Sequence, residues 1–248
     1  MSEIKADSFT SNMKLLKVLL QKEMEVYFLS PLAYAFLGVF AFLSGLFFYL
    51  GLGISPEPNL RILIINLSLT LLFLLPLLTM RQFAEEMRTG TFEMLMTSPL
   101  PLWVMIAAKW LASVTLCLVL FLGTMIFPLM IAYLGNPDWG AIFAGYVGLI
   151  LCTMSFVSAG LFASSLTQEP VSAGLIGVLL LLPFWLCGVA SDFVDVQWLK
   201  TFLHEFSFVT HLLPFSKGLI DSVDVLWFCL FSIFFLHLTW RSVESKRW

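Results

Sequence analysis

The side chains best suited to binding a partner lie in one segment, residues 81–93, between two long apolar stretches. The segment reads RQFAEEMRTGTFE and is the densest charge cluster between the two termini. Two short helices fit it. The first is Arg81–Thr89, closed by Gly90, a residue that readily takes the left-handed conformation of a helix end. The second is Phe92–Thr97, which the Thr91 side chain can cap.

On the first predicted helix, Phe83 and Met87 lie four residues apart on one face, while Glu85, Glu86 and Arg88 lie elsewhere. An apolar ridge with acidic flanks could dock in a groove of a soluble partner and transmit force to the adjoining apolar stretches. A solvated elbow that only links two membrane spans fits the same residues. The pattern by itself leaves both interpretations open.

The other candidate motifs predict no enzyme and no metal site. The phosphate-binding pattern GxxxxGK[ST] does not occur in the sequence. His204-Glu205 begins the zinc pattern HExxH, but Phe208 occupies the position of the second histidine. His204, Glu205 and His211 could still meet on one helix face, although histidines at a membrane interface are the simpler interpretation. The four cysteines fall inside apolar runs without metal-binding spacing, so we interpret them as packing residues: Cys117, Cys152, Cys187 and Cys229.

The composition indicates an integral membrane protein. Hydrophobic residues make up 60% of the 248 residues and charged residues 12%, against about 25% charged residues in soluble domains. Residues 1–12 are polar, and we expect a disordered tail there rather than a cleavable signal peptide. We assign residues 13–248 to a single all-α transmembrane domain.

Six membrane spans are expected, at residues 31–53, 60–80, 102–134, 139–166, 171–190 and 225–240. Residues 62–80 carry no charge, and such a helix crosses about 30 Å of hydrocarbon. Lys14–Tyr27 predicts an amphipathic helix that lies in the headgroup plane and braces the first span. Ser191–Asp224 is too charged to span and too apolar for a free loop. We expect one or two short re-entrant or interfacial helices there.

The predicted spans hold few ionisable groups. No Asp, Glu or Arg falls in the middle of a span, and Lys109 lies near one end of the third span, where its side chain can extend to water. Carriers driven by ion gradients usually need ionisable groups inside the membrane. The sequence therefore disfavours a secondary transporter or a proton pump.

The fourth span carries a stripe of small residues at helical spacing. Small residues let neighbouring helices approach closely in lipid, so this face is predicted to pack against other spans. The stripe consists of Ala144, Gly148, Cys152, Ser155, Ala159 and Ala163.

The lysines and arginines predict the orientation. Ten fall on the side of the two termini and of residues 81–93, and three fall on the other side. Basic residues concentrate on the cytoplasmic side, so both termini and this segment are expected in the cytoplasm. The larger set is Lys5, Lys14, Lys17, Lys22, Arg81, Arg88, Lys109, Arg241, Lys246 and Arg247, and the smaller is Arg61, Lys200 and Lys217.

Three stretches resemble the permeases of type-2 ABC exporters, most closely the gliding-motility-associated (GldF-like) branch. They read PLLTMRQFAEEMRTGTFEMLMTSPL at 76–100, FSFVTHLLPFSKGLID at 206–221 and LTWRSVESKR at 238–247. The resemblance covers nearly the whole chain in span layout, with about forty residues of motif.

The resemblance implies that residues 81–99 form a coupling helix seated in a cleft of a separate ATPase. The residues expected to couple are Arg81, Phe83, Glu85, Glu86, Met87, Arg88, Thr89, Gly90, Thr91 and Glu93. It also implies a second permease half, identical or related, and a bacterial inner-membrane location. ATP and magnesium would belong to the ATPase, with no cofactor in this chain. Membrane lipid is an expected partner, a large membrane-anchored extracytoplasmic subunit is a candidate partner, and nucleic acid is not expected.

Two functions follow from this resemblance. The chain is either the permease of an exporter, or a scaffold that relays ATPase motion to an extracytoplasmic partner without transporting a substrate. Few polar side chains lie on the predicted spans, which suits a lipidic substrate or no substrate at all.

Overall fold

The computed structural model describes residues 2–54, 60–97, 101–135, 137–191, 193–194 and 196–246. Within these ranges every regular element is a helix, as the all-α prediction requires. Six helical segments are long and apolar enough to cross a membrane, which confirms the expected number of spans within the described part of the chain. The helices are α1 Ser2–Leu29, α2 Pro31–Ile54, α3 Arg61–Thr79, α4 Arg81–Thr89, α5 Thr91–Thr97, α6 Leu102–Thr124, α7 Ile126–Leu134, α8 Trp139–Leu166, α9 Pro170–Ser191, α10 Gln197–Glu205, α11 Phe208–Ser216 and α12 Ser222–Ser245.

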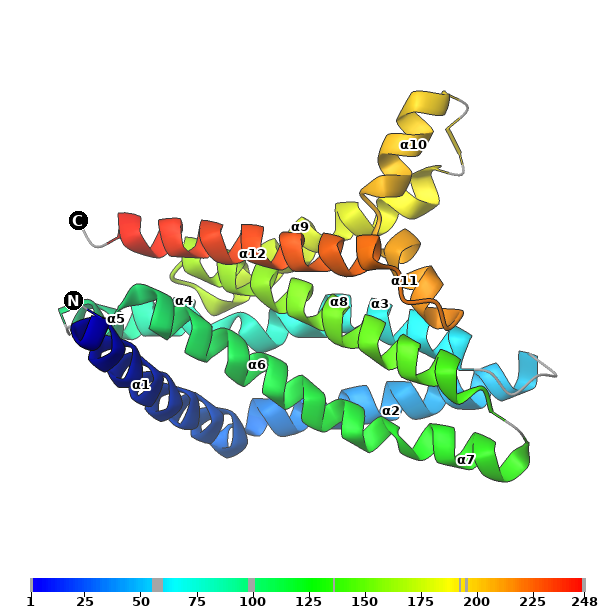
Figure 1. Cartoon of the computed structure of the whole chain (residues 1–248), viewed down its shortest axis with the longest axis horizontal. Helices are drawn as coiled ribbons and strands as arrows, with labels where there is room; N and C mark the ends of the chain where they lie inside the picture. Colours follow the sequence, from blue (N-terminus) through cyan, green and yellow to red (C-terminus); the bar gives the residue numbers. More distant parts are fainter. Residues whose placement is uncertain are drawn as a thin grey trace.

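The long helix α8 lies at the centre of the bundle and packs against α3, α6, α9, α11 and α12, and also against α4 (Figure 1). All six small residues of its stripe are buried. Gly148 illustrates why they are small. A Cβ atom added there would lie 2.7 Å from the Phe215 Cβ and 3.0 Å from the Leu212 Cδ1, so α11 can approach α8 only at a glycine.

The first helix differs from the prediction. Residues 2–12 continue α1 instead of forming a disordered tail. This segment contains neither proline nor glycine, so no residue in it prevents the amphipathic helix at Lys14–Tyr27 from extending toward the N-terminus. The amphipathic part, Lys14–Tyr27, packs along α6 and touches the start of α2.

The third span is broken, which was not predicted. Helix α6 ends at Thr124, and α7 begins at Ile126. Pro128 has no backbone N–H, so it cannot donate to the Thr124 carbonyl four residues earlier. The Tyr146 hydroxyl of α8 donates to that carbonyl instead, at 3.1 Å. A tyrosine on the neighbouring span thus satisfies the acceptor that the proline leaves open.

The last span is longer than residues 225–240. It begins at Ser222, because the Asp221 side chain accepts a hydrogen bond from the Val223 N–H at 3.0 Å and caps the helix. It continues through Arg241 to Ser245, so most of the predicted basic tail is helical.

The two ends of the bundle differ in character. The first turn of α1 and the last turn of α12 lie at the same end as α4 and α5 (Figure 1). The re-entrant segment 191–224 lies at the opposite end and forms two short helices, α10 and α11, as expected. Helix α11 is packed into the bundle, whereas α10 projects from it and contributes no buried side chain.

Candidate functional site

Helices α4 and α5 pack against each other at the end of the bundle where the chain begins and ends. Gly90 joins them with φ 75°, the left-handed conformation that its sequence position predicted. The Thr91 hydroxyl lies 3.0 Å from the Thr89 Oγ1 and donates to the Glu86 carbonyl at 3.3 Å. These contacts tie the start of α5 to the last turn of α4. Glu93 lies in the first turn of α5.

The inner face of α4 is packed inside this chain. Phe83 and Ala84 are fully buried, and Met87 is partly buried. The predicted partner ridge of Phe83 and Met87 is therefore wrong at Phe83, which cannot touch a soluble partner. The reason is geometric: α4 follows α3 after the single residue Met80 and lies against α8, so its apolar face turns inward.

A serine from α8 caps the start of α4. Ser164 Oγ accepts hydrogen bonds from the backbone N–H groups of Phe83, at 3.0 Å, and Ala84, at 3.2 Å. It also donates to the Met80 carbonyl at 3.0 Å. The first N–H groups of a helix have no partner within the helix, so this side chain fixes α4 to the central span. The sequence offered no sign of it, since the two segments are about eighty residues apart.

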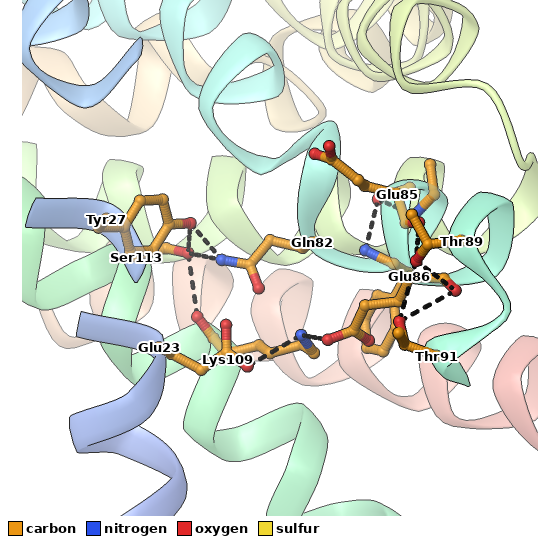
Figure 2. A network of polar contacts seen from close by, with 12 residues as sticks. Glu23, Tyr27, Gln82, Glu85, Glu86, Thr89, Thr91, Lys109 and Ser113 are labelled. Atoms are coloured by element: carbon orange, nitrogen blue, oxygen red, sulfur yellow. Dashed lines mark hydrogen bonds and ion pairs between the residues drawn. The ribbon is translucent and has the colours of Figure 1, made fainter. Parts of the chain in front are cut away.

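Lys109 lies between two carboxylates and is buried. Its Nζ is 3.0 Å from Glu23 Oε1 on α1 and 2.6 Å from Glu86 Oε1 on α4, and its side chain is 2% exposed (Figure 2). The expectation that Lys109 extends to water is wrong, because α1 covers this end of α6 and brings its own carboxylate. The triad of Glu23, Lys109 and Glu86 joins α1, α6 and α4 by charge.

A second polar chain links the same three helices. Gln82 Nε2 donates to the Tyr27 hydroxyl and to Ser113 Oγ, the latter at 3.3 Å. The Tyr27 hydroxyl lies 2.8 Å from Ser113 Oγ, which donates to the Lys109 carbonyl at 3.0 Å (Figure 2). Burial raises the pKa of Tyr27, so this hydroxyl stays protonated and available as a donor.

The last helix also reaches α4. Lys246 Nζ donates to the Ser165 carbonyl at 2.7 Å and lies 3.2 Å from Met87 Sδ. Ser242 Oγ donates to the same carbonyl at 3.1 Å. The ends of α8 and α12 and the inner face of α4 therefore meet at one point.

The outer side of the α4–α5 pair is solvated. Arg81, Arg88, Thr89, Gly90, Thr91 and Glu93 are exposed. Glu85 lies 3.7 Å from Arg81 Nε and 3.9 Å from Arg88 Nη2, and such long exposed ion pairs contribute little to stability. Of the ten residues expected to couple, Phe83 is internal, Glu86 and Met87 are largely internal, and the remaining seven lie on or near the surface.

At the opposite end, His211 contacts an aspartate and a backbone carbonyl. His211 Nδ1 lies 2.6 Å from Asp224 Oδ1, and its Nε2 lies 2.9 Å from the Glu205 backbone carbonyl, so the Glu205 side chain takes no part. The imidazole ring also stacks on Trp227 at 4.5 Å. No group of three or more metal-ligating side chains occurs among the described residues. His211 instead fastens α11 to α12.

Six apolar spans and a capped, charged helix pair at one end define a multi-pass membrane protein with an anchored surface element. The family model of the ABC-2 type transporter matches residues 14–218, so this chain belongs to the ABC-2 type transporter membrane family. A comparison with curated protein sequences found no match.

Family membership makes the chain a permease component of an ABC transporter, with no catalytic domain of its own. It also implies two kinds of partner, an ATPase and a second permease copy or relative. The matched residues include α4 and α5.

Proposed function

We propose that this chain is the permease of a bacterial inner-membrane ABC exporter and that α4 and α5 couple it to a separate ATPase. Both termini and the helix pair face the cytoplasm in this proposal, as the distribution of basic residues predicts. The substrate is lipidic, because the spans offer few polar side chains. The motif resemblance supports placing the chain in the gliding-motility-associated branch.

One observation carries the coupling role. Helix α4 is exposed and charged on one side and joined on the other to α1, α6, α8 and α12 through Glu86, Gln82, the Ser164 cap and Met87. An element that only connects two spans needs no such fastening. A helix that transmits force from a soluble partner needs both an exposed face and rigid contacts with the rest of the chain.

The experiment reverses an exposed charge on the outer side of α4. Arg88→Glu leaves the buried contacts intact, since the Arg88 side chain is 60% exposed. We expect loss of co-purification with the partner ATPase, together with loss of ATPase stimulation, while the melting temperature stays unchanged. Lys200→Glu, an exposed substitution on α10 at the other end, serves as the control. Normal assembly of Arg88→Glu would refute the coupling role.

A second candidate function is a mechanical relay without a transported substrate. The feature that favours it is α10, which projects from the bundle and exposes Trp198 at 73% and Phe202 at 54%. These side chains offer a contact for an extracytoplasmic partner. Liposomes that contain the permease–ATPase complex distinguish the two functions. ATP-dependent transfer of lipid between leaflets supports the exporter, and ATP hydrolysis without transfer supports the relay.

A further inference from the structure

A cavity of about 500 Å³ opens between α1, α4 and α5 at the end of the bundle where the charged triad lies. This volume is typical of sites for small ligands. The cavity reaches past the ends of α2 and α3, so it extends from the polar segment to the apolar spans. Its two walls differ sharply in chemistry.

The apolar wall consists of side chains at the span ends. Val26 of α1, Leu32 and Ala33 of α2 and Leu78 of α3 line it. They lie at the level where the long apolar helices begin or end. An occupant therefore meets apolar surface on the side of the membrane and charge on the other side, which is the arrangement that a lipid requires.

The charged wall has an excess of acceptors at its deep end. Lys109 supplies one positive charge to the carboxylates of Glu23 and Glu86, which leaves the triad one negative charge in excess. Two oxygen atoms there have no hydrogen-bond partner among the described residues, Glu86 Oε2 and Gln82 Oε1. Gln82 is 7% exposed, so its amide oxygen is a buried acceptor without a hydrogen-bond donor, which is unfavourable.

A primary ammonium group matches this deep end. It carries one positive charge and three N–H donors, whereas the unpaired atoms are one buried carboxylate oxygen and one buried amide oxygen. The side chains of Gln82 and Glu86 both line the cavity, and Figure 2 shows the Gln82 amide oxygen on the side of the Lys109–Glu86 ion pair. The terminal torsions of Glu and Gln are soft, so a small rotation turns either oxygen toward an occupant.

Two cations line the same cavity, apart from the triad. Lys22 of α1 is exposed, and the Arg81 side chain is 49% exposed, with its Nε 3.7 Å from Glu85, which also lines the cavity. Both suit a phosphate group, which arginine and lysine bind through charge-assisted hydrogen bonds. The cavity therefore presents acceptors for an ammonium, donors for a phosphate and an apolar wall, all on helices α1 to α4.

We propose that this cavity binds the headgroup of a phosphatidylethanolamine molecule from the adjacent leaflet. The ammonium lies against Glu86 and Gln82, the phosphate against Lys22 and Arg81, and the first methylene groups against Leu32 and Leu78. The bound lipid joins α1 to α4 across the cavity. This lipid site is independent of the coupling role proposed for α4, because it depends only on the residues that line the cavity.

The test compares headgroups that differ in N–H donors. The full chain is reconstituted in nanodiscs that contain phosphatidylglycerol with either phosphatidylethanolamine or phosphatidylcholine, and the lipid retained after transfer to detergent is counted by native mass spectrometry. We expect phosphatidylethanolamine to be retained about tenfold more than phosphatidylcholine, whose trimethylated nitrogen donates no hydrogen bond. Equal retention of the two lipids, or preferential retention of phosphatidylglycerol, overturns the proposal.

Two lysine variants on one helix complete the test. Lys22→Ala removes a phosphate contact, and Lys17→Ala removes an exposed lysine of α1 that does not line the cavity. We expect about tenfold lower retention of phosphatidylethanolamine for Lys22→Ala and unchanged retention for Lys17→Ala. Gln82→Leu should abolish the preference over phosphatidylcholine. Identical retention by Lys22→Ala and Lys17→Ala overturns the proposal.

Discussion

Replacing Lys109 with methionine removes the ammonium that contacts both Glu23 and Glu86. Methionine has a similar length, so the change leaves little empty volume and chiefly exposes the two carboxylates to each other. Breaking a buried ion pair by removing one partner costs about 3–5 kcal/mol. The two contacting oxygens lie at most about 5.6 Å apart, since they are 3.0 and 2.6 Å from the same Nζ, and at an effective dielectric constant of about 20 the carboxylates repel by about 3 kcal/mol, which agrees in magnitude. We therefore expect Lys109→Met to lower the free energy of unfolding by about 3–5 kcal/mol.

Thermal unfolding of the purified chain in detergent measures this loss, followed by the fluorescence of its eight tryptophans. For a protein of this size the expected shift is a melting temperature lower by about 10 °C. The control is the combined variant Glu23→Gln, Lys109→Met and Glu86→Gln, which removes all three charges. Its stability should recover most of the loss, because no uncompensated buried charge remains.

The same two variants separate stability from coupling. We expect the combined variant to fold without the Glu23–Lys109–Glu86 ion pairs, so its ATPase stimulation measures what these ion pairs contribute to coupling. We expect that stimulation to fall well below that of the wild type. Wild-type melting of Lys109→Met would refute the electrostatic reasoning, as would a combined variant that melts as early as Lys109→Met.

Three further substitutions test individual contacts by thermal unfolding of the full chain. Ser164→Ala should destabilise the protein by about 1–2 kcal/mol, because two buried N–H groups of α4 lose their acceptor, whereas Ser165→Ala removes only a bond within α8 and should cost less. Gly90→Ala should cost about 1–2 kcal/mol through the left-handed backbone alone, since no atom lies within 4 Å of the added Cβ. Gly90→Asn should cost less, and equal effects of the two substitutions would contradict this account. Gly148→Ala should cost about 1–3 kcal/mol, because the added methyl group collides with α11. Gly123→Ala should be neutral or stabilising, because the space around Gly123 is open. A neutral Gly148→Ala would show that α11 does not pack there as closely as described.

Local sequence signals predicted most of the helices. The six apolar stretches match the six candidate spans found in the described part of the chain, and Gly90 marks the boundary between α4 and α5, as predicted. Both depend on neighbouring residues alone, through hydropathy and backbone preference. Residues 2–12 are polar, yet they are helical, because they contain no helix-breaking residue.

The anchoring of α4 could not be predicted, because it depends on contacts between distant segments. Lys109 has the sequence position of an interfacial lysine, but α1 covers it and contributes Glu23, which lies 86 positions away in the sequence. Phe83 has the sequence pattern of a partner-binding surface, but α4 packs against α8, which buries Phe83 inside the bundle. Contacts between distant segments leave no local pattern in the sequence, which is why Phe83 was expected on an exposed ridge although it is buried.

Helix α8 joins the two ends of the bundle as a single rigid element. Ser164 holds α4 at one end, and Gly148 holds α11 near the other, sixteen residues or about 24 Å away at 1.5 Å per residue. A tilt of about 5° around Ser164 would displace the Gly148 end by about 2 Å, comparable to a small rotation between packed helices. A small movement of α4 that leaves its hydrogen bonds to Ser164 intact can therefore tilt α8. The same tilt produces a larger displacement at the α11 end of the bundle.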